Sequence, residues 1–426
     1  MTLGFLLLLL VASKPVLDFF WQSKFSLFGR SISPQGLLGI AFFLLSFFIA
    51  NFDFRNEKNF RQVAAFRFCY AFSMLLILSR LCFKIGDAEM TLRYGASMAA
   101  LIIIPWSVRS VAGDTKKISS IGALLVFSLV SVIATIILQL LGFLPWQSFD
   151  NFFLMQKLVE ITKVGRLSGA YFHPLDLVRV LIWPYLLICN LMLVQNQKKL
   201  NTIMLFSLFT LWNLVLFLTT HRLSIFLAVT IISLLCWQKK TLRICLQAYL
   251  LICLSWLIGG AMIAERAKAP IEKVISVANL TSNPSDGSDA SLSISKFATN
   301  ASRGRLHFWQ QHFDWISSFS VLELASGTRR DFPKDADHEA QAHNQLLDLL
   351  ERFGILGVLS FVAAIILGIW KMQVPPPWKI STLACLGIYS LITEPLFAPT
   401  FLWWAVLYCS LPMLFVVNIY EESHSL

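Results

Sequence analysis

The chain has 426 residues, of which 57% are hydrophobic and only 14% are charged, and its mean hydropathy is +0.68. This is too little polar surface to coat a core of that size, so the composition excludes an ordinary soluble globular protein. The net charge of +11 does not indicate nucleic-acid binding, because the basic residues lie in short clusters between apolar segments.

Apolar segments of about 17 to 25 residues, long enough for a helix to cross ~30 Å of hydrocarbon, recur along the chain. Strands of a membrane barrel would be shorter and would alternate in polarity. We therefore expect an all-α polytopic membrane protein with about twelve transmembrane helices. The predicted spans are residues 2–21, 37–53, 62–83, 94–111, 121–146, 175–194, 202–220, 222–237, 245–264, 352–370, 380–397 and 400–417.

Basic residues concentrate in alternate connections, which the positive-inside rule places in the cytoplasm together with both termini. Lys24, Arg30, Lys84 and Arg93 lie on the other side and weaken this pattern without reversing it. The cytoplasmic set comprises Arg55, Lys58, Arg61, Arg109, Lys116, Lys117, Lys198, Lys199, Lys239, Lys240, Arg243, Lys371 and Lys379.

The long connection at residues 265–351 is the only sizeable soluble segment that the sequence predicts. It divides the chain into residues 1–264 with nine spans, the loop at 265–351, and residues 352–426 with three spans and a tail. Its first part is rich in Ser, Asn, Asp and Gly, and the pattern at 305–319 predicts a helix. We expect this loop to lie outside the cytoplasm and to contain short helices.

Three arginines in the outer segments are candidates for binding phosphate. Arg222 lies between two apolar runs with hardly any loop, and a charge at the membrane edge is costly without a partner. A lipid diphosphate would suit it, because a planar guanidinium binds phosphate oxygens bidentately. We expect Arg166 and Arg305 to converge with Arg222 and His343. Singly, Arg222 also fits a snorkelling anchor, Arg166 and Arg305 solvated loop charges, and His343 a surface or capping residue.

The segment after His343 and Asn344 predicts an amphipathic helix. Its apolar residues recur at helical spacing, so we expect it to lie along the membrane surface and to hold the imidazole at headgroup height. The apolar positions are Leu346, Leu347, Leu350 and Phe353.

Two acidic residues of this short helix, Asp348 and Glu351, are expected on its solvated outer face. Gly354 and Gly357 are small enough for the helix that follows to pack closely against a neighbour. Glu394 lies in the outer half of a late span, and a carboxylate within a membrane indicates a function. It is a second candidate for orienting His343 or an acceptor.

The spacing of His343, Asn344, Gly354 and Gly357, with nine residues between Asn344 and Gly354 and two between the glycines, resembles the signature of the O-antigen ligase superfamily. The basic elements upstream are similar in order. They are Arg166 with Ser168 and Gly169, Arg222 at the start of a span, and Arg305 in Gly-Arg-Leu with Trp309 four residues later. The chain departs from the family at His221, where a Ser commonly precedes the Arg, and at the additional Arg303.

The resemblance implies an inverting membrane glycosyltransferase, without cofactor or metal, that acts on the periplasmic side of a bacterial inner membrane. Its donor would be a glycan on undecaprenyl diphosphate and its acceptor a sugar hydroxyl, while membrane lipids would surround it and nucleic acid would be no partner. Arg166, Arg222 and Arg305 would bind the diphosphate and His343 would be the general base. Residues of second rank are Arg303, Asn344 and Glu394.

Several functions remain open within and outside this family. The acceptor that we favour is lipid A core, while an O-antigen or exopolysaccharide polymerase and a protein O-oligosaccharyltransferase use the same chemistry. A transporter of lipid-linked glycans is the alternative from another class, and it predicts interrupted helices with charges at mid-membrane in matching halves. The marked residues here lie at one face, which favours chemistry at the surface.

Overall fold

The computed structural model of this chain is helical apart from one short hairpin in the residues that it describes. In the hairpin β1 (Phe25–Leu27) pairs antiparallel with β2 (Arg30–Ile32), and Phe25 lies opposite Ile32. The described residues are 2–17, 25–27, 30–32, 34–53, 60–83, 85, 88–141, 143, 174–194, 199–219, 228–233, 242–262, 305–328, 344–392 and 399–414. The helical fold class is confirmed.

Each predicted span except 222–237 overlaps a long described helix, and residues 228–233 within that exception are also helical. The predicted helix at 305–319 is present as well. The helices are α1 (Leu3–Leu17), α2 (Pro34–Asp53), α3 (Phe60–Cys82), α4 (Ala88–Val111), α5 (Thr115–Leu140), α6 (Pro174–Val194), α7 (Lys199–Leu218), α9 (Leu242–Met262), α12 (Arg305–Ser317), α13 (Val321–Ser326), α14 (Gln345–Lys371), α15 (Pro376–Ile392) and α16 (Pro399–Ser410).

Four described helices, α3, α4, α5 and α14, are long and apolar enough to cross a membrane. Others, including α1, α6 and α16, have shorter apolar stretches of 10–17 residues. These helices fit a membrane protein, as the composition predicts. The full set of twelve spans and the side of the loop stay predictions.

Helix α4 lies at the centre of the described bundle. Of its most apolar window 83% is buried inside the structure, against 28% for α3 and for α5, and it packs against α1, α2, α3, α14 and α16. Small residues permit this close packing: a Cβ at Gly95 would lie 2.5 Å from the ring of Phe43 on α2, and Trp403 of α16 donates to the Ala96 carbonyl at 2.8 Å. The outer face of α5 exposes Phe127 and Ile137, as expected for contact with lipid.

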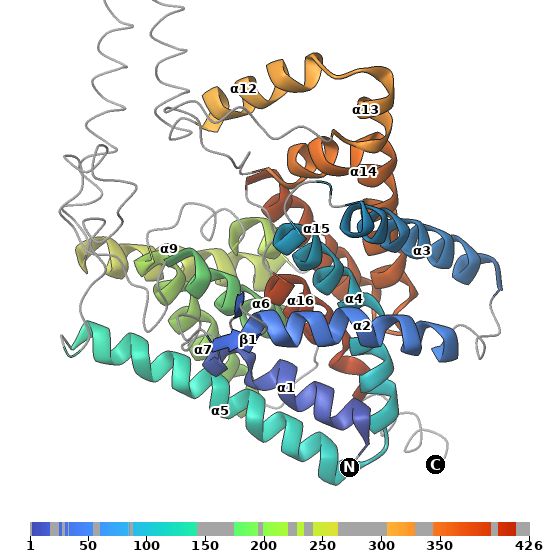
Figure 1. Ribbon diagram of the computed structural model, residues 1–426. Helices are drawn as coiled ribbons and strands as arrows, with labels where there is room; N and C mark the ends of the chain where they lie inside the picture. The colour runs from blue at the N-terminus through green and yellow to red at the C-terminus, as the bar shows by residue number, and fades with distance from the viewer. Residues whose placement is uncertain are drawn as a thin grey trace, which may run out of the picture.

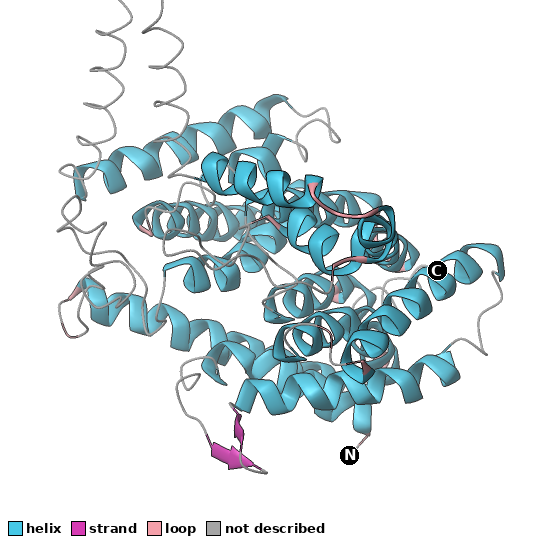
Figure 2. Cartoon of the chain, turned by 45° about the horizontal axis from the view of Figure 1, so that its top comes forward, coloured by secondary structure: helices cyan, strands magenta, loops and turns pink. Residues whose placement is uncertain are grey.

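The loop helices α12 and α13 lie together at one end of the bundle, next to the start of α14 (Figure 1). The hairpin lies at the periphery of the helices (Figure 2). Because α12 and α13 pack on α14, they bring residues 305–326 of the predicted outer loop onto the segment that follows His343.

Candidate functional site

The first residue after the predicted base is held firmly. Asn344 is the N-cap of α14: its side-chain oxygen accepts from the backbone N–H groups of Leu346 at 3.0 Å and Leu347 at 3.2 Å. Its amide nitrogen donates to the Leu391 carbonyl of α15 at 3.2 Å. The cap therefore fixes both the start of α14 and the position of the chain where it leaves His343, which lies outside the described residues.

A second contact anchors the first turn of α14 to the central helix. The Gln345 amide nitrogen donates to the Tyr94 hydroxyl at 2.9 Å, and both side chains are buried. The Tyr94 ring then meets Phe353 edge to face, with ring centroids 5.5 Å apart. The segment between Gln345 and Phe353 is thus held at both ends by one tyrosine of α4.

Helix α14 has a sharp kink at Gly354, where φ is +68° and ψ is −173°. A Cβ at Gly354 would overlap the Ala325 carbonyl of α13 and lie 2.5 Å from the backbone nitrogen of Ser326. This confirms the close packing predicted for Gly354 and identifies α13 as its neighbour. At Gly357 a Cβ would overlap the Cβ of Phe353, so this glycine relieves crowding inside the kinked helix itself.

Helix α13 is shaped locally to meet this kink. A capping box starts it: the Ser320 hydroxyl accepts from the Glu323 backbone N–H at 3.3 Å, and the Glu323 carboxylate accepts from the Ser320 N–H at 2.9 Å. Gly327 ends it with φ at +88°. A Cβ there would overlap the Arg352 carbonyl, so two glycines let the backbones of α13 and α14 touch.

Backbone carbonyls beside the kink accept hydrogen bonds from donors outside α14. The Thr328 N–H donates to the Glu351 carbonyl at 2.9 Å, and the Arg80 guanidinium of α3 donates to the carbonyls of Arg352 and Thr328. Arg80 also lies over the Phe353 ring, 5.5 Å from its centroid. No role for Arg80 was predicted, although an arginine within an apolar helix is itself a signal of one.

A buried polar network lies between α12 and α14. His312 Nδ1 contacts the Glu351 carboxylate, and Arg352 Nε donates to Asp348 at 2.8 Å. The exposed fraction is 1% for His312, 3% for Asp348 and 7% for Glu351. The expectation that Asp348 and Glu351 face solvent is therefore wrong. Helices α12 and α13 cover this face of α14, and His312 and Arg352 supply hydrogen-bonding partners to the buried carboxylates.

His312 was missed by the sequence analysis, but a signal for it exists. It shares one face of α12 with Trp309 and Ile316, at helical spacings of three and four residues. Ile316 and Leu347 form the small apolar core between the two helices, and Trp309 packs against it. A histidine on the apolar face of an amphipathic helix requires a buried partner, and Glu351 supplies it.

Two polar atoms beside this core have no hydrogen-bond partner in the described part of the chain. They are Nε1 of Trp309 and Oδ2 of Asp348, and both are buried. One is a donor and the other an acceptor, and Asp348 lies one turn after Asn344. The end of α14 next to His343 therefore retains unused hydrogen-bonding capacity.

Of the predicted site residues, the structure describes two. Asn344 caps α14, and Arg305 is the first residue of α12. The others, Arg166, Arg222, Arg303, His343 and Glu394, lie outside the described residues, so the convergence of the basic groups stays a prediction. Within the described residues, no group of three or more His, Cys, Asp or Glu side chains could hold a metal ion.

The fold and the described site define the class of this chain as a helical protein with apolar helices that fit a membrane. No family model, no curated protein and no solved structure matches it. The resemblance to the O-antigen ligase superfamily therefore depends on the sequence motifs alone.

Proposed function

We propose that this chain transfers a glycan from undecaprenyl diphosphate to a sugar hydroxyl, with inversion and without a metal, at the periplasmic face of a bacterial inner membrane. One observation carries the proposal. Helix α12, which Arg305 opens, packs against the part of α14 that directly follows His343, and the buried His312–Glu351 pair joins them. Two motif elements that are far apart in sequence thus belong to helices in contact.

In the proposed reaction the acceptor oxygen forms a bond to the anomeric carbon while the bond from that carbon to the diphosphate oxygen breaks. His343 takes the proton of the acceptor hydroxyl. The electron pair of the broken bond leaves with the diphosphate, whose growing charge Arg166, Arg222 and Arg305 stabilise. One displacement gives inversion at the anomeric carbon.

The described residues contribute rigidity to this mechanism. A general base has to lie within about 2.6–3.2 Å of the proton donor, so the chain at His343 has to be held closely. Three contacts immobilise α14, which starts two residues after His343: the Asn344 cap, the Gln345 bond to Tyr94 and the buried pair of Glu351 with His312. They are positioning residues in this proposal.

The test uses purified protein in detergent with lipid-linked glycan and acceptor. We expect His343→Ala to lower transfer at least about 100-fold, the smallest contribution typical of a general base, while donor binding persists. His338→Ala, from the same segment, is the matched control and should retain activity. Transfer should also continue in EDTA. Near-normal activity of His343→Ala, or a strict demand for magnesium or manganese, would overturn the proposal.

Lipid A core is the acceptor that we propose, and the phenotype of a deletion strain checks it. Loss of long glycan from lipid A core indicates ligation. A single repeat unit left on the core would instead indicate a polymerase, and an unmodified secreted or pilin-like protein would indicate protein glycosylation. Bond formation by detergent-solubilised protein would distinguish any of these enzymes from a transporter, which needs two compartments and makes no bond.

A further inference from the structure

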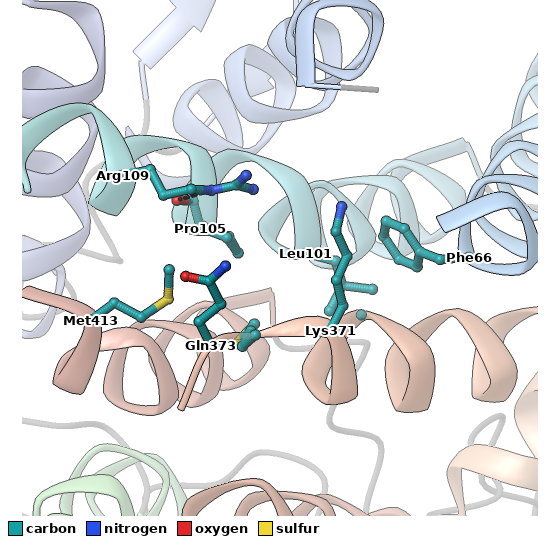
Figure 3. A pocket seen from close by; sticks show the side chains of 9 residues that line it. Phe66, Leu101, Pro105, Arg109, Lys371, Gln373 and Met413 are labelled. Carbon is teal, nitrogen blue, oxygen red and sulfur yellow. Dashed lines mark hydrogen bonds between the residues drawn. The ribbon is translucent and has the colours of Figure 1, made fainter. Parts of the chain in front are cut away.

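A second polar site lies at the other end of α14, about 25 Å along the helix from the kink at Gly354. It is a pocket between the ends of α4 and α14, with parts of α3 and α16 in its wall. Figure 3 shows the side chains of Arg109, Gln373 and Lys371 around this hollow. No step of the proposed glycan transfer uses it.

The pocket carries positive charge. Arg109 Nε donates to the Pro105 carbonyl at 3.4 Å, and Lys371 Nζ lies 5.5 Å from the centroid of the Phe66 ring. These contacts hold both cations at the pocket wall. Gln373 adds an exposed amide, and the described residues that line the pocket include neither Asp nor Glu. The described lining of the site therefore includes two cations and an amide.

Among the described residues, Asp114 in the turn after α4 is the first carboxylate that follows Arg109 in the sequence, and it forms a local ion pair. Asp114, three residues after Val111 at the end of α4, forms an ion pair with Lys117, with 2.7 Å between Oδ2 and Nζ. The hydrogen bond and charge of Lys117 lower the pKa of Asp114, so this carboxylate stays ionised and pairs locally. The two cations of the pocket lie in the last turns of α4 and α14, Arg109 in the first and Lys371 in the second.

The remaining wall of the pocket is apolar. Phe66, Leu101, Pro105 and Met413 contribute ring, aliphatic and thioether surface. Gly368 keeps this part open, because a Cβ there would lie 3.1 Å from Phe66 and 3.3 Å from Leu101. A ligand that fits both the cationic wall and the apolar wall has an anionic head with an apolar portion attached to it.

We propose that this pocket binds the phosphate group of an anionic membrane lipid. A phosphodiester accepts charge-assisted hydrogen bonds from Arg109, Lys371 and Gln373, while the attached carbons lie against the apolar wall. Lys371 ends a helix that is long and apolar enough to cross a membrane, which places the pocket at headgroup level. Basic pockets between membrane helices on the cytoplasmic side recognise lipid phosphates in this way.

The test measures saturable binding to the purified full-length chain by native mass spectrometry. The probes are dihexanoyl phosphatidylglycerol, dihexanoyl phosphatidylcholine and inorganic phosphate. We expect the first to bind most tightly, because the choline cation of the second is repelled and the third lacks an apolar portion. Each lost charge-assisted contact should weaken binding about tenfold, so the double variant Arg109→Gln/Lys371→Gln should bind about 100-fold more weakly.

Lys116→Gln/Lys117→Gln removes the same charge from α5 and is the matched control, for which we expect affinity within about twofold of the parent because exposed charges contribute little. Should the pocket double variant fail to fold, Gln373→Leu is the second variant, with an expected loss of about tenfold. If inorganic phosphate bound as tightly as phosphatidylglycerol, the assignment of a lipid as ligand would be wrong. The ligand would then be a soluble phosphate compound. Absence of saturable binding, or equal affinity in pocket and control variants, would overturn the site.

Discussion

The kink of α14 gives the sharpest test of the structure, through the substitution Gly354→Ala. At φ +68° and ψ −173° the backbone occupies a region that is almost restricted to glycine. The added methyl would also overlap the Ala325 carbonyl, which belongs to backbone and cannot rotate away. The chain therefore has to unbend α14 or displace α13.

Both effects destabilise the native state. A residue other than glycine in such a conformation costs about 1–3 kcal/mol, and overpacking a filled site costs about 1–3 kcal/mol. Together they predict that Gly354→Ala lowers the free energy of unfolding by about 2–6 kcal/mol. The neighbouring Gly327, which contacts the Arg352 carbonyl, should behave in the same way because its φ is +88°.

The assay is unfolding of the purified protein by SDS in mixed micelles, with hydrogen exchange of the α13 amides as a local readout. Gly387→Ala in α15 is the matched control, because a Cβ there meets no atom within 4 Å. Helix propensity predicts that this control is neutral or stabilised by up to about 1 kcal/mol. If Gly354→Ala unfolded like Gly387→Ala and left exchange of α13 unchanged, the described contact between α13 and α14 would be wrong.

Two further predictions concern the residues that hold the start of α14. Glu351→Gln should lower the free energy of unfolding by about 1–3 kcal/mol, because it weakens the buried hydrogen bond to His312. A double-mutant cycle with His312→Phe measures the coupling, and strictly additive losses would contradict the pair. Asn344→Ala should cost about 1 kcal/mol of stability and also lower transfer, whereas Asn344→Ser keeps a capping oxygen, loses only the bond to the Leu391 carbonyl and should be destabilised less. Equal stability of the two Asn344 variants in SDS titration would show that the cap contributes nothing.

Local sequence predicted the helices because the thickness of a bilayer sets the length of an apolar helix. The helix that opens at Arg305 follows from its periodicity, and the close packing at Gly354 follows from its small size, whereas the kink there was not predicted. These features depend on residues within a few turns of one another. For the same reason, the candidate site could be predicted only as motifs: their mutual placement is a long-range property.

What the sequence alone determined is the class of fold and the order of its apolar helices. The tertiary structure decided which charges are buried. Glu351 meets His312 across 39 residues of chain, and Arg80 reaches the Thr328 carbonyl across 248. An acidic residue on a helix looks solvated until a distant segment covers it, because the free energy of a charge depends on its surroundings in space and on its partner.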